Sequence, residues 1–236
     1  MISLILPYWD RQAATDRALA LLSTVDPDLD LEVVVVDDGS PVPFVKPSWP
    51  IDIRVLRLPA KSGPLNPCVP YNAGVEASRG TWVALSNPEI LHRQPVLAAM
   101  RDECAGRGEE AYVMAAAWCP EQGRWHCHSS RQRTDDNDVG AYLPAGADYH
   151  FMTMMHRSLW DKTGGFDEDY RLGAGYDDPD FVRRLHRAGA QFVMRDDLVV
   201  EHPRLGAHAD WTGAQFARNR AIFMKKWEPL TEKVAA

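Results

Sequence analysis

The sequence lacks the features that would place it outside the cell or across a membrane. It has four cysteines among its 236 residues, and they are widely scattered. Scattered cysteines in a chain of this length favour reduced thiols over a disulfide framework. No apolar run is long enough to span a bilayer, and the apolar start at Ile2–Leu6 meets Pro7 at once instead of continuing as a signal peptide would. We therefore expect a cytoplasmic protein.

The sequence also has no strong excess of positive charge and no standard zinc motif. The formal net charge is −7, which disfavours a general coat for nucleic acid or for an anionic membrane, although a local basic patch stays compatible with it. Cys119 and Cys127 lie near His126 and His128, but the two cysteines are far apart and no second tight pair completes a tetrahedron. This spacing favours ordinary packing of these residues over a structural zinc site.

What the sequence does contain is an ordinary globular balance of 45% hydrophobic and 25% charged residues, enough for a sizeable core. The pattern indicates strands alternating with helices, and hence one α/β domain with a mostly parallel sheet. The expected strands are 2–6, 31–36, 51–58, 81–86, 112–118 and one within 191–200, with an apolar segment at 151–156. The expected helices are 10–23, 71–79, 95–104, 158–163, 178–188 and 211–227, and 121–140 is expected to be a polar surface excursion.

An acidic pair follows the most strongly β-branched stretch of the chain. Val33–Val36 is typical of a strand covered on both faces, and Asp37 and Asp38 come directly after it, before a Gly-Ser turn. Ligands of open α/β sheets bind beyond the carboxyl ends of the strands, so the pair is a candidate site. The alternative is that both carboxylates only cap the turn.

Four segments, in this order, together resemble the nucleotide-sugar glycosyltransferases of family 2, which have the GT-A fold. They are SLILPYWDR (3–11), VDDGS (36–40), NAGV with ASRGTWVAL (72–75 and 77–85), and GGFDE with GYDDPDF (164–168 and 175–181). The resemblance implies a single Rossmann-like GT-A domain over 1–236, with a mixed, mostly parallel sheet flanked by helices. Its nucleotide-binding half would be about 1–90, its acceptor half about 91–210 and its C-terminal helix about 211–228.

The resemblance also implies a binding site for the donor nucleotide. An apolar or aromatic wall and a few directed hydrogen bonds are what a base requires. Asp38 would accept a hydrogen bond from a uracil imide, which makes a UDP-sugar the favoured donor, although thymine carries the same group. The residues expected at the nucleotide are Pro7, Tyr8, Trp9, Asp38, Asn72 and Asn87. Asn72 is expected to open its helix, and Tyr71 stands where the family often has an arginine.

The metal motif departs from the family pattern. Family members carry Asp-x-Asp after the fourth strand, and this chain has Asn87-Pro88-Glu89 there. Related folds have a further metal ligand in a histidine after the last strand, so the resemblance implies a reduced site for Mn²⁺ or Mg²⁺, which suit hard oxygen ligands, at Glu89 and His202. The alternative is transfer without a metal, in which Arg204, His208 or Arg218 balances the charge of the diphosphate.

The remaining motif, Asp177-Asp178-Pro179-Asp180, matches the acidic motif that supplies the general base of inverting members of the family. Asp178 is the expected base and Asp177 the second choice, with crowding by neighbouring acids raising the pKa. Their ordinary role would be to stabilise a helix N-terminus. The glycines at 173 and 175 indicate a flexible approach to this cluster. Asp148, Tyr149 and His150 are expected to line the sugar or acceptor pocket.

These residues predict an inverting transfer of a hexose from a nucleoside-diphosphate sugar to a hydroxyl group. The acceptor is a glycan, a lipid-linked sugar, a protein or a modified nucleic-acid base. A nucleotidyltransferase is a rival, but Pro7–Arg11 lacks the glycines of a phosphate loop. A non-catalytic nucleotide- or sugar-binding module is the second rival, because Asp-x-Asp is missing.

Overall fold

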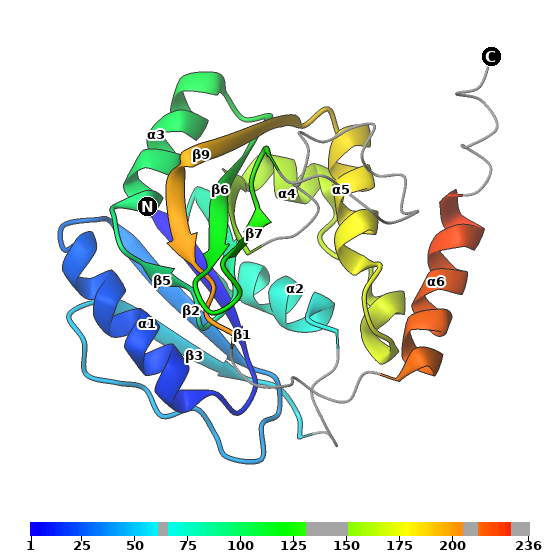
Figure 1. Ribbon diagram of the computed structural model, residues 1–236, viewed down its shortest axis with the longest axis horizontal. Coiled ribbons are helices and arrows are strands. Elements are labelled where there is room, and N and C mark those ends of the chain that lie inside the picture. Colours follow the sequence, from blue (N-terminus) through cyan, green and yellow to red (C-terminus); the bar gives the residue numbers. More distant parts are fainter. Residues whose placement is uncertain (61–65, 131–150, 205–211, 228–236) are drawn as a thin grey trace.

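The computed structural model describes residues 1–60, 66–130, 151–204 and 212–227 (Figure 1). The strands are β1 (Ile2–Tyr8), β2 (Leu31–Asp37), β3 (Asp52–Arg57), β4 (Trp82–Ser86), β5 (Leu91–His92), β6 (Ala111–Cys119), β7 (Arg124–Cys127), β8 (Met152–His156) and β9 (Gln191–Glu201). The helices are α1 (Gln12–Val25), α2 (Cys68–Ala77), α3 (Val96–Arg107), α4 (Arg157–Thr163), the 3₁₀ helix η1 (Glu168–Leu172), α5 (Asp177–Arg187) and α6 (Gly213–Trp227).

All of these strands belong to one mixed sheet, in the order β3-β2-β1-β4-β8-β6-β9-β5, with β7 paired to β6. The first four strands in this order run parallel. β8 is antiparallel to both of its neighbours, β4 and β6. β9 runs parallel to β6 and antiparallel to β5. The expected α/β architecture with a mixed, mostly parallel sheet is therefore confirmed.

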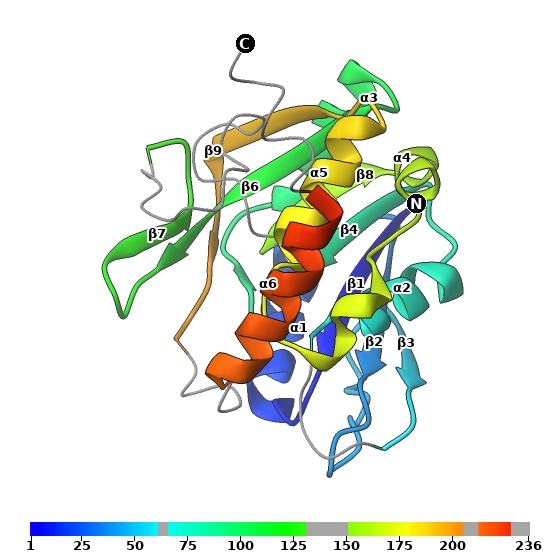
Figure 2. The ribbon, with the colours of Figure 1, turned by 90° about the vertical axis from the view of Figure 1, so that its right-hand side faces the viewer.

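The two faces of the sheet carry separate apolar cores. Successive side chains of a strand point to opposite faces. In β2, Val33 and Val35 accordingly belong to the core that also contains α1 and α3, whereas Val34 and Val36 belong to the core that contains α2, α4 and α5. This burial on both sides explains why β2 is apolar without alternation. A third, small core joins η1 to α6, which lies outside α5 (Figure 2).

The order of the parallel strands creates a crevice at one edge of the sheet. β1 lies between β2 and β4, so the chain leaves it toward one neighbour and later returns on its other side. α1 covers one face and α2 the other. The carboxyl ends of β1 and β4 therefore form a topological switch point, where open α/β sheets bind their ligands.

Two short strands, β5 and β7, were not expected from the sequence. β7 lies inside the segment that was expected to be a surface excursion, and it pairs with the end of β6 as a hairpin. No helix among the described residues combines the length and the apolar character needed to cross a membrane. The four cysteines are free and buried, as expected.

Candidate active site

The residues after β1, β2 and β4 come together at the switch point. Tyr8 is paired with Asp37 in the parallel register, and the backbone N–H of Asp38 donates to the carbonyl of Tyr8 at 2.9 Å. Asn87 and Glu89 follow β4 on the other side of β1. The residues after β1, β2 and β4 thus meet at one edge of the sheet, as the sequence predicted.

Asp37 and Asp38 have different environments. Burial pushes the pKa of Asp37 up, but backbone N–H groups of Phe44 and Ser40, at 3.0 and 2.8 Å, and the guanidinium of Arg57 bring it below its ordinary value. Asp37 therefore holds the loop after β2, as the capping alternative required. Asp38 lies one residue closer to the edge and is 5% exposed. The capping account fits Asp37, and Asp38 is the candidate for a ligand contact.

The aromatic wall expected after β1 is only partly present. Tyr8 is 1% exposed, and its ring packs edge-on against Phe44 with the centroids 4.9 Å apart. Tyr8 is therefore a core residue, because its alternation in β1 turns it toward α1 and away from the edge. Pro7 and Trp9 are half-buried and keep surface at the crevice.

The positions of Tyr71 and Asn72 correct a second expectation. α2 begins at Cys68, not at Tyr71, with Pro67 as its N-cap residue, and the side-chain oxygen of Asn66 accepts from the N–H of Cys68 at 3.1 Å. Asn72 therefore lies within the helix and does not open it. Its amide donates to the carbonyl of Phe166 at 2.9 Å and to Glu168 at 3.0 Å, and its oxygen accepts from the N–H of Phe166 at 2.8 Å.

Tyr71, at the place where the family often has arginine, is buried. Its hydroxyl donates to the carbonyl of Ser86 at 3.3 Å, and its ring stacks on Phe166 at 5.2 Å. Both residues therefore join α2 to the GGFDE segment. The amide of Asn72 is used within the protein, so we do not include it in the proposed nucleotide site.

The first turn of α2 is the meeting point of the candidate acids. Burial raises the pKa of Tyr71 well above its ordinary value, and neighbouring negative charges raise it further. Those charges belong, in decreasing order of effect, to Asp178, Glu89 and Asp177. Burial likewise raises the pKa of the Cys68 thiol, with added effects from Asp177 and Asp38 among its neighbours. Four carboxylates from three separate segments thus lie close enough to this helical turn to act on its ionisable side chains.

Glu89 lies in a compact polar cluster after β4. Its carboxylate is 3% exposed, and Oε1 accepts from Nη1 of Arg11 at 3.0 Å. Nε2 of His202 lies 3.4 Å from the same oxygen and 3.3 Å from Nδ2 of Asn87. An imidazole nitrogen and a carboxylate therefore face each other, as two ligands of a divalent ion would, whereas Asn87 turns its N–H₂ group toward His202. Among the described residues, no group of three or more His, Cys, Asp or Glu side chains forms a metal cage.

A cavity of about 500 Å³ adjoins this cluster. Its lining comes from the start of α1 and from the segments after β4 and β9, and includes Asp10, Arg11, Arg17, Glu89 and Pro203. Its wall carries charges of both signs, because two arginines lie beside the two acids Asp10 and Glu89. Glu89 and Arg11 can thus be reached by a ligand.

His126 is a residue of this region that the sequence did not connect with the site. Its Nδ1 lies 3.0 Å from Nδ1 of His202, and its Nε2 lies 2.9 Å from Oε1 of Gln122. The ring of Phe151 packs against both histidines. A cluster of histidines in the sequence was visible at 126–128, but only the β6–β7 hairpin brings one of them to His202.

The acids of the DDPD motif have separate environments at the start of α5. Asp177 is 5% exposed, and burial raises its pKa to about 6, against hydrogen bonds from Asn66 and from backbone N–H groups. The charge of Asp180 adds only a minor increase, so burial, and not crowding, is the main cause. Asp178 is half-buried in the first helical turn, where the helix dipole favours a negative charge.

Asp180 is fully buried and acts in the structure of the protein. It accepts from Nε1 of Trp227 at 2.8 Å and Nε of Arg184 at 2.8 Å, with Nζ of Lys226 also at 2.8 Å. The bond to Trp227 ties α5 to α6.

The glycines before this cluster correct another expectation. A Cβ at Gly173 would lie 2.0 Å from Oδ1 of Asn219, and the amide of Asn219 donates to the carbonyl of Gly175 at 2.8 Å. These glycines therefore permit close packing of α6. The structure gives them this packing role in place of the flexible approach expected from the sequence.

Three further expectations concern other residues. Asp148, Tyr149 and His150, and also His208, lie outside the described residues. Cys119 and Cys127 contact different partners: the thiol of Cys119 lies 3.6 Å from Glu121, and that of Cys127 lies 3.9 Å from the sulfur of Met194. In the hairpin, Cys127 pairs with Ala117 and Cys119 with Arg124, so the two thiols do not face each other.

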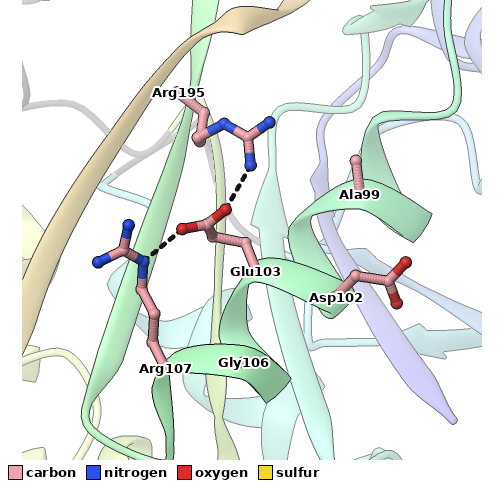
Figure 3. A pocket seen from close by; sticks show the side chains of 6 residues that line it. All are labelled: Ala99, Asp102, Glu103, Gly106, Arg107 and Arg195. Carbon is pink, nitrogen blue, oxygen red and sulfur yellow. Dashed lines mark hydrogen bonds and ion pairs between the residues drawn. The ribbon is translucent and has the colours of Figure 1, made fainter.

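A second cavity, of about 560 Å³, lies between α3 and β9 (Figure 3). Glu103 stands in it between Arg107 and Arg195, and Arg195 also pairs with Asp197 at 2.6 Å. Its charges are balanced by these ion pairs. None of the candidate site residues lines it.

Solved structures with the same arrangement come from glycosyltransferases. Residues 1–349 of TarS from S. aureus, in complex with UDP-GlcNAc, align with a TM-score of 0.65 and 17% identity over 94% of this chain and 65% of that chain. The mannosyltransferase PcManGT from Pyrobaculum calidifontis, in complex with GDP-Man and Mn²⁺, aligns with a TM-score of 0.60 and 17% identity over 94% and 61%. The chain has the GT-A fold of glycosyltransferases.

The likeness in GT-A fold extends over nearly the whole chain but over only part of those structures. Against a longer TarS structure, this chain aligns over 95% of its own length and 39% of the other, with 16% identity and a TM-score of 0.65. No protein-family model matches the sequence, and no curated protein does. At such identities the comparison establishes the fold, and the activity has to be argued from the site.

Proposed function

We propose that this GT-A protein is an inverting glycosyltransferase that transfers a hexose from a nucleoside-diphosphate sugar to a hydroxyl acceptor. The proposal is supported by the negative charges of Asp38, Glu89, Asp177 and Asp178, which all act on Cys68 or Tyr71 in the first turn of α2. A structural role explains Asp37 and Asp180, but it does not explain four buried or half-buried acids at a topological switch point.

One part of the proposed site would bind the base of the donor nucleotide. Asp38, with Pro7 and Trp9 beside it, would receive the base, because its carboxylate can accept from the imide N–H of uracil. We therefore propose UDP as the nucleotide, and the TarS structure in complex with UDP-GlcNAc supports this choice. PcManGT was solved with GDP-Man, so a GDP-sugar is the alternative donor, and the experiment must distinguish it from a UDP-sugar.

A divalent ion fits the polar cluster after β4. Glu89 and His202 would hold Mn²⁺ or Mg²⁺, and the ion would supply positive charge to the departing diphosphate. Such ions are often held by one or two protein carboxylates together with substrate phosphates, which suits a site without a complete protein cage. The Mn²⁺ in the PcManGT structure supports this proposal. Arg11, paired with Glu89, would add a second positive charge.

Asp178 would act as the general base. In the proposed step the acceptor hydroxyl gives its proton to the carboxylate of Asp178, and its oxygen forms a bond to the anomeric carbon. The bond from that carbon to the diphosphate breaks, and the nucleoside diphosphate leaves with the electron pair. Attack from the face opposite to the leaving group inverts the configuration. Asp177, which is more deeply buried and has its pKa raised to about 6, is the second candidate for the base.

The proposal is tested with a thermal-shift panel of UDP-, GDP- and dTDP-sugars, each with and without Mn²⁺, followed by an assay of donor hydrolysis and transfer. A donor that binds the native state raises the melting temperature by mass action. We expect Asp178→Asn to keep this donor shift and to lose transfer by at least about a hundredfold, in the range attributed to general bases. Asp161→Asn, which changes an exposed acid on α4, is the matched control.

The outcomes separate the proposal from its rival. Donor binding without turnover by the wild-type protein would favour the non-catalytic binding module. Transfer that survives in Asp178→Asn would overturn the assignment of the base. The absence of a shift with every nucleotide sugar would contradict the whole proposal.

A further inference from the structure

The histidine expected as a metal ligand is held by a second histidine from the β6–β7 hairpin. The backbone N–H of His202 donates to the carbonyl of Trp118 at 2.8 Å, and the N–H of Arg204 donates to Glu121 at 3.0 Å. The segment after β9 is thus attached to this hairpin at two points. The Nδ1 atoms of His126 and His202 then meet at 3.0 Å.

Gln122 determines which ring nitrogen of a neutral His126 bears the proton. Oε1 of Gln122 lies 2.9 Å from Nε of Arg124, and an arginine N–H can only donate. The Gln122 atom is therefore the carbonyl oxygen, and its second partner, Nε2 of His126 at 2.9 Å, must also donate. A neutral His126 with its proton on Nε2 has an acceptor at Nδ1. His202 must then donate from its own Nδ1.

This arrangement leaves the other ring nitrogen of His202 as an electron-pair donor. Nε2 of His202 faces Oε1 of Glu89 at 3.4 Å and the side-chain amide of Asn87 at 3.3 Å. A histidine that binds a metal usually donates its second ring N–H to a neighbouring acceptor, which fixes the tautomer and the orientation of the ring. In this chain the neighbouring acceptor is Nδ1 of His126.

We propose that Gln122 and His126 are positioning residues that fix the tautomer of His202, so that Nε2 is available to a divalent ion at Glu89. The proposal rests on the metal site of the proposed function and adds a pair of residues that act through His202. The ring of Phe151, with centroids 4.7 Å from His202 and 5.5 Å from His126, covers the contact and limits competition by water.

The experiment compares three variants of the full chain. His126→Leu removes the acceptor, whereas His126→Asn keeps a side-chain acceptor close to the position of Nδ1. His128→Leu is the matched control: it makes the same change two residues further along the hairpin, where the ring stacks on Trp125 and pairs with Asp196. Binding of Mn²⁺ is measured by its electron paramagnetic resonance signal, with and without UDP. Heteronuclear NMR of the metal-free protein shows which ring nitrogen of His202 bears the proton.

We expect Nδ1 of His202 to bear the proton in the wild-type protein and in His126→Asn. His126→Leu should shift the proton toward Nε2 and weaken Mn²⁺ binding about 10- to 100-fold, the usual effect of losing such a partner. His128→Leu should bind Mn²⁺ like the wild type. Rescue by His126→Asn separates positioning from damage to the hairpin.

Three results would overturn the proposal. They are a proton on Nε2 of His202 in the wild-type protein, unchanged Mn²⁺ binding in His126→Leu, and equal losses in His126→Leu and His128→Leu. A wild-type protein that binds UDP-sugar but no Mn²⁺ would also overturn it, and would leave the glycosyltransferase proposal intact. A wild-type protein that binds no nucleotide sugar, but whose variants behave as expected, would instead contradict the proposed function alone.

Discussion

Nε2 of His202 lies 3.4 Å from Oε1 of Glu89, although the two residues follow different strands, β9 and β4. The same oxygen accepts from Arg11, so Glu89 joins three segments of the chain at the switch point. Its carboxylate is 3% exposed. A charge at such a position is stable only while its partners remain, so Glu89 must contribute to folding as well as to any bound ion.

We expect Glu89→Gln to lower the free energy of unfolding by about 1–3 kcal/mol, because Arg11 keeps its charge and loses its charged partner. It should also remove the Mn²⁺-dependent part of the donor shift. Denaturant unfolding and the thermal-shift panel measure the two effects. Glu201→Gln is the control, since its pair with Arg93 is 28% and 48% exposed and should contribute at most about 1 kcal/mol. Equal effects of the two substitutions would contradict this account.

The raised pKa of Asp177 leads us to expect that the stability of the protein falls as the pH rises. Burial raises its pKa from 3.8 to about 6 in the folded protein. Between these two values the unfolded chain has lost the proton and the folded protein keeps it, so stability falls as the pH rises, and it levels off above about pH 6. Asp177→Asn should remove this fall and raise stability at neutral pH by up to about 2–3 kcal/mol. Melting temperatures of both proteins across this pH range test the prediction, and parallel profiles would contradict it.

Asp180 is the acid of the DDPD motif that we expect to stabilise the fold. We expect Asp180→Asn to destabilise the protein by about 3–5 kcal/mol, because Arg184 and Lys226 would lose a fully buried charged partner. The bond from Trp227 also weakens, so α6 should show faster hydrogen exchange than α5. Asp178→Asn is the matched comparison in the same helix. A larger loss of stability in Asp178→Asn than in Asp180→Asn would reverse the roles assigned to the two residues.

The sequence predicted the parts of this fold that depend on local patterns and on strand ends. The β-branched run Val33–Val36 indicated a strand buried on both faces, and β2 is such a strand. Parallel strands bring their carboxyl ends to one edge, so the residues after β1, β2 and β4 were expected together and are together. The separate roles of Asp37 and Asp38 were left open, because they depend on Arg57, which only the fold brings to Asp37.

The sequence could not predict contacts made by segments without a regular pattern. β7 has only four residues, so its periodicity gave no signal, and the meeting of His126 with His202 depends on its pairing with β6. α2 started three residues earlier than expected, and the side chain of Asn66 in the preceding loop accepts from the N–H of its first residue, Cys68. Tyr8 was expected at the ligand, but the side-chain alternation of β1 turns it into the core.

Tyr71 occupies the position where family 2 glycosyltransferases often have an arginine, and we expect it to act in packing. Its hydroxyl donates to the carbonyl of Ser86 at 3.3 Å, and its ring stacks on Phe166. Tyr71→Phe should therefore cost about 1 kcal/mol, the usual value of one hydrogen bond, and leave donor binding unchanged. Tyr71→Arg should cost more than about 3 kcal/mol, because the buried site would have to hold a charge and would lose the stacked ring. Denaturant unfolding measures both changes, and the thermal shift with UDP-sugar measures donor binding. If Tyr71→Arg instead folded normally and bound the donor more tightly, then the side chain at this position would reach the nucleotide, and the packing role assigned to Tyr71 would be wrong.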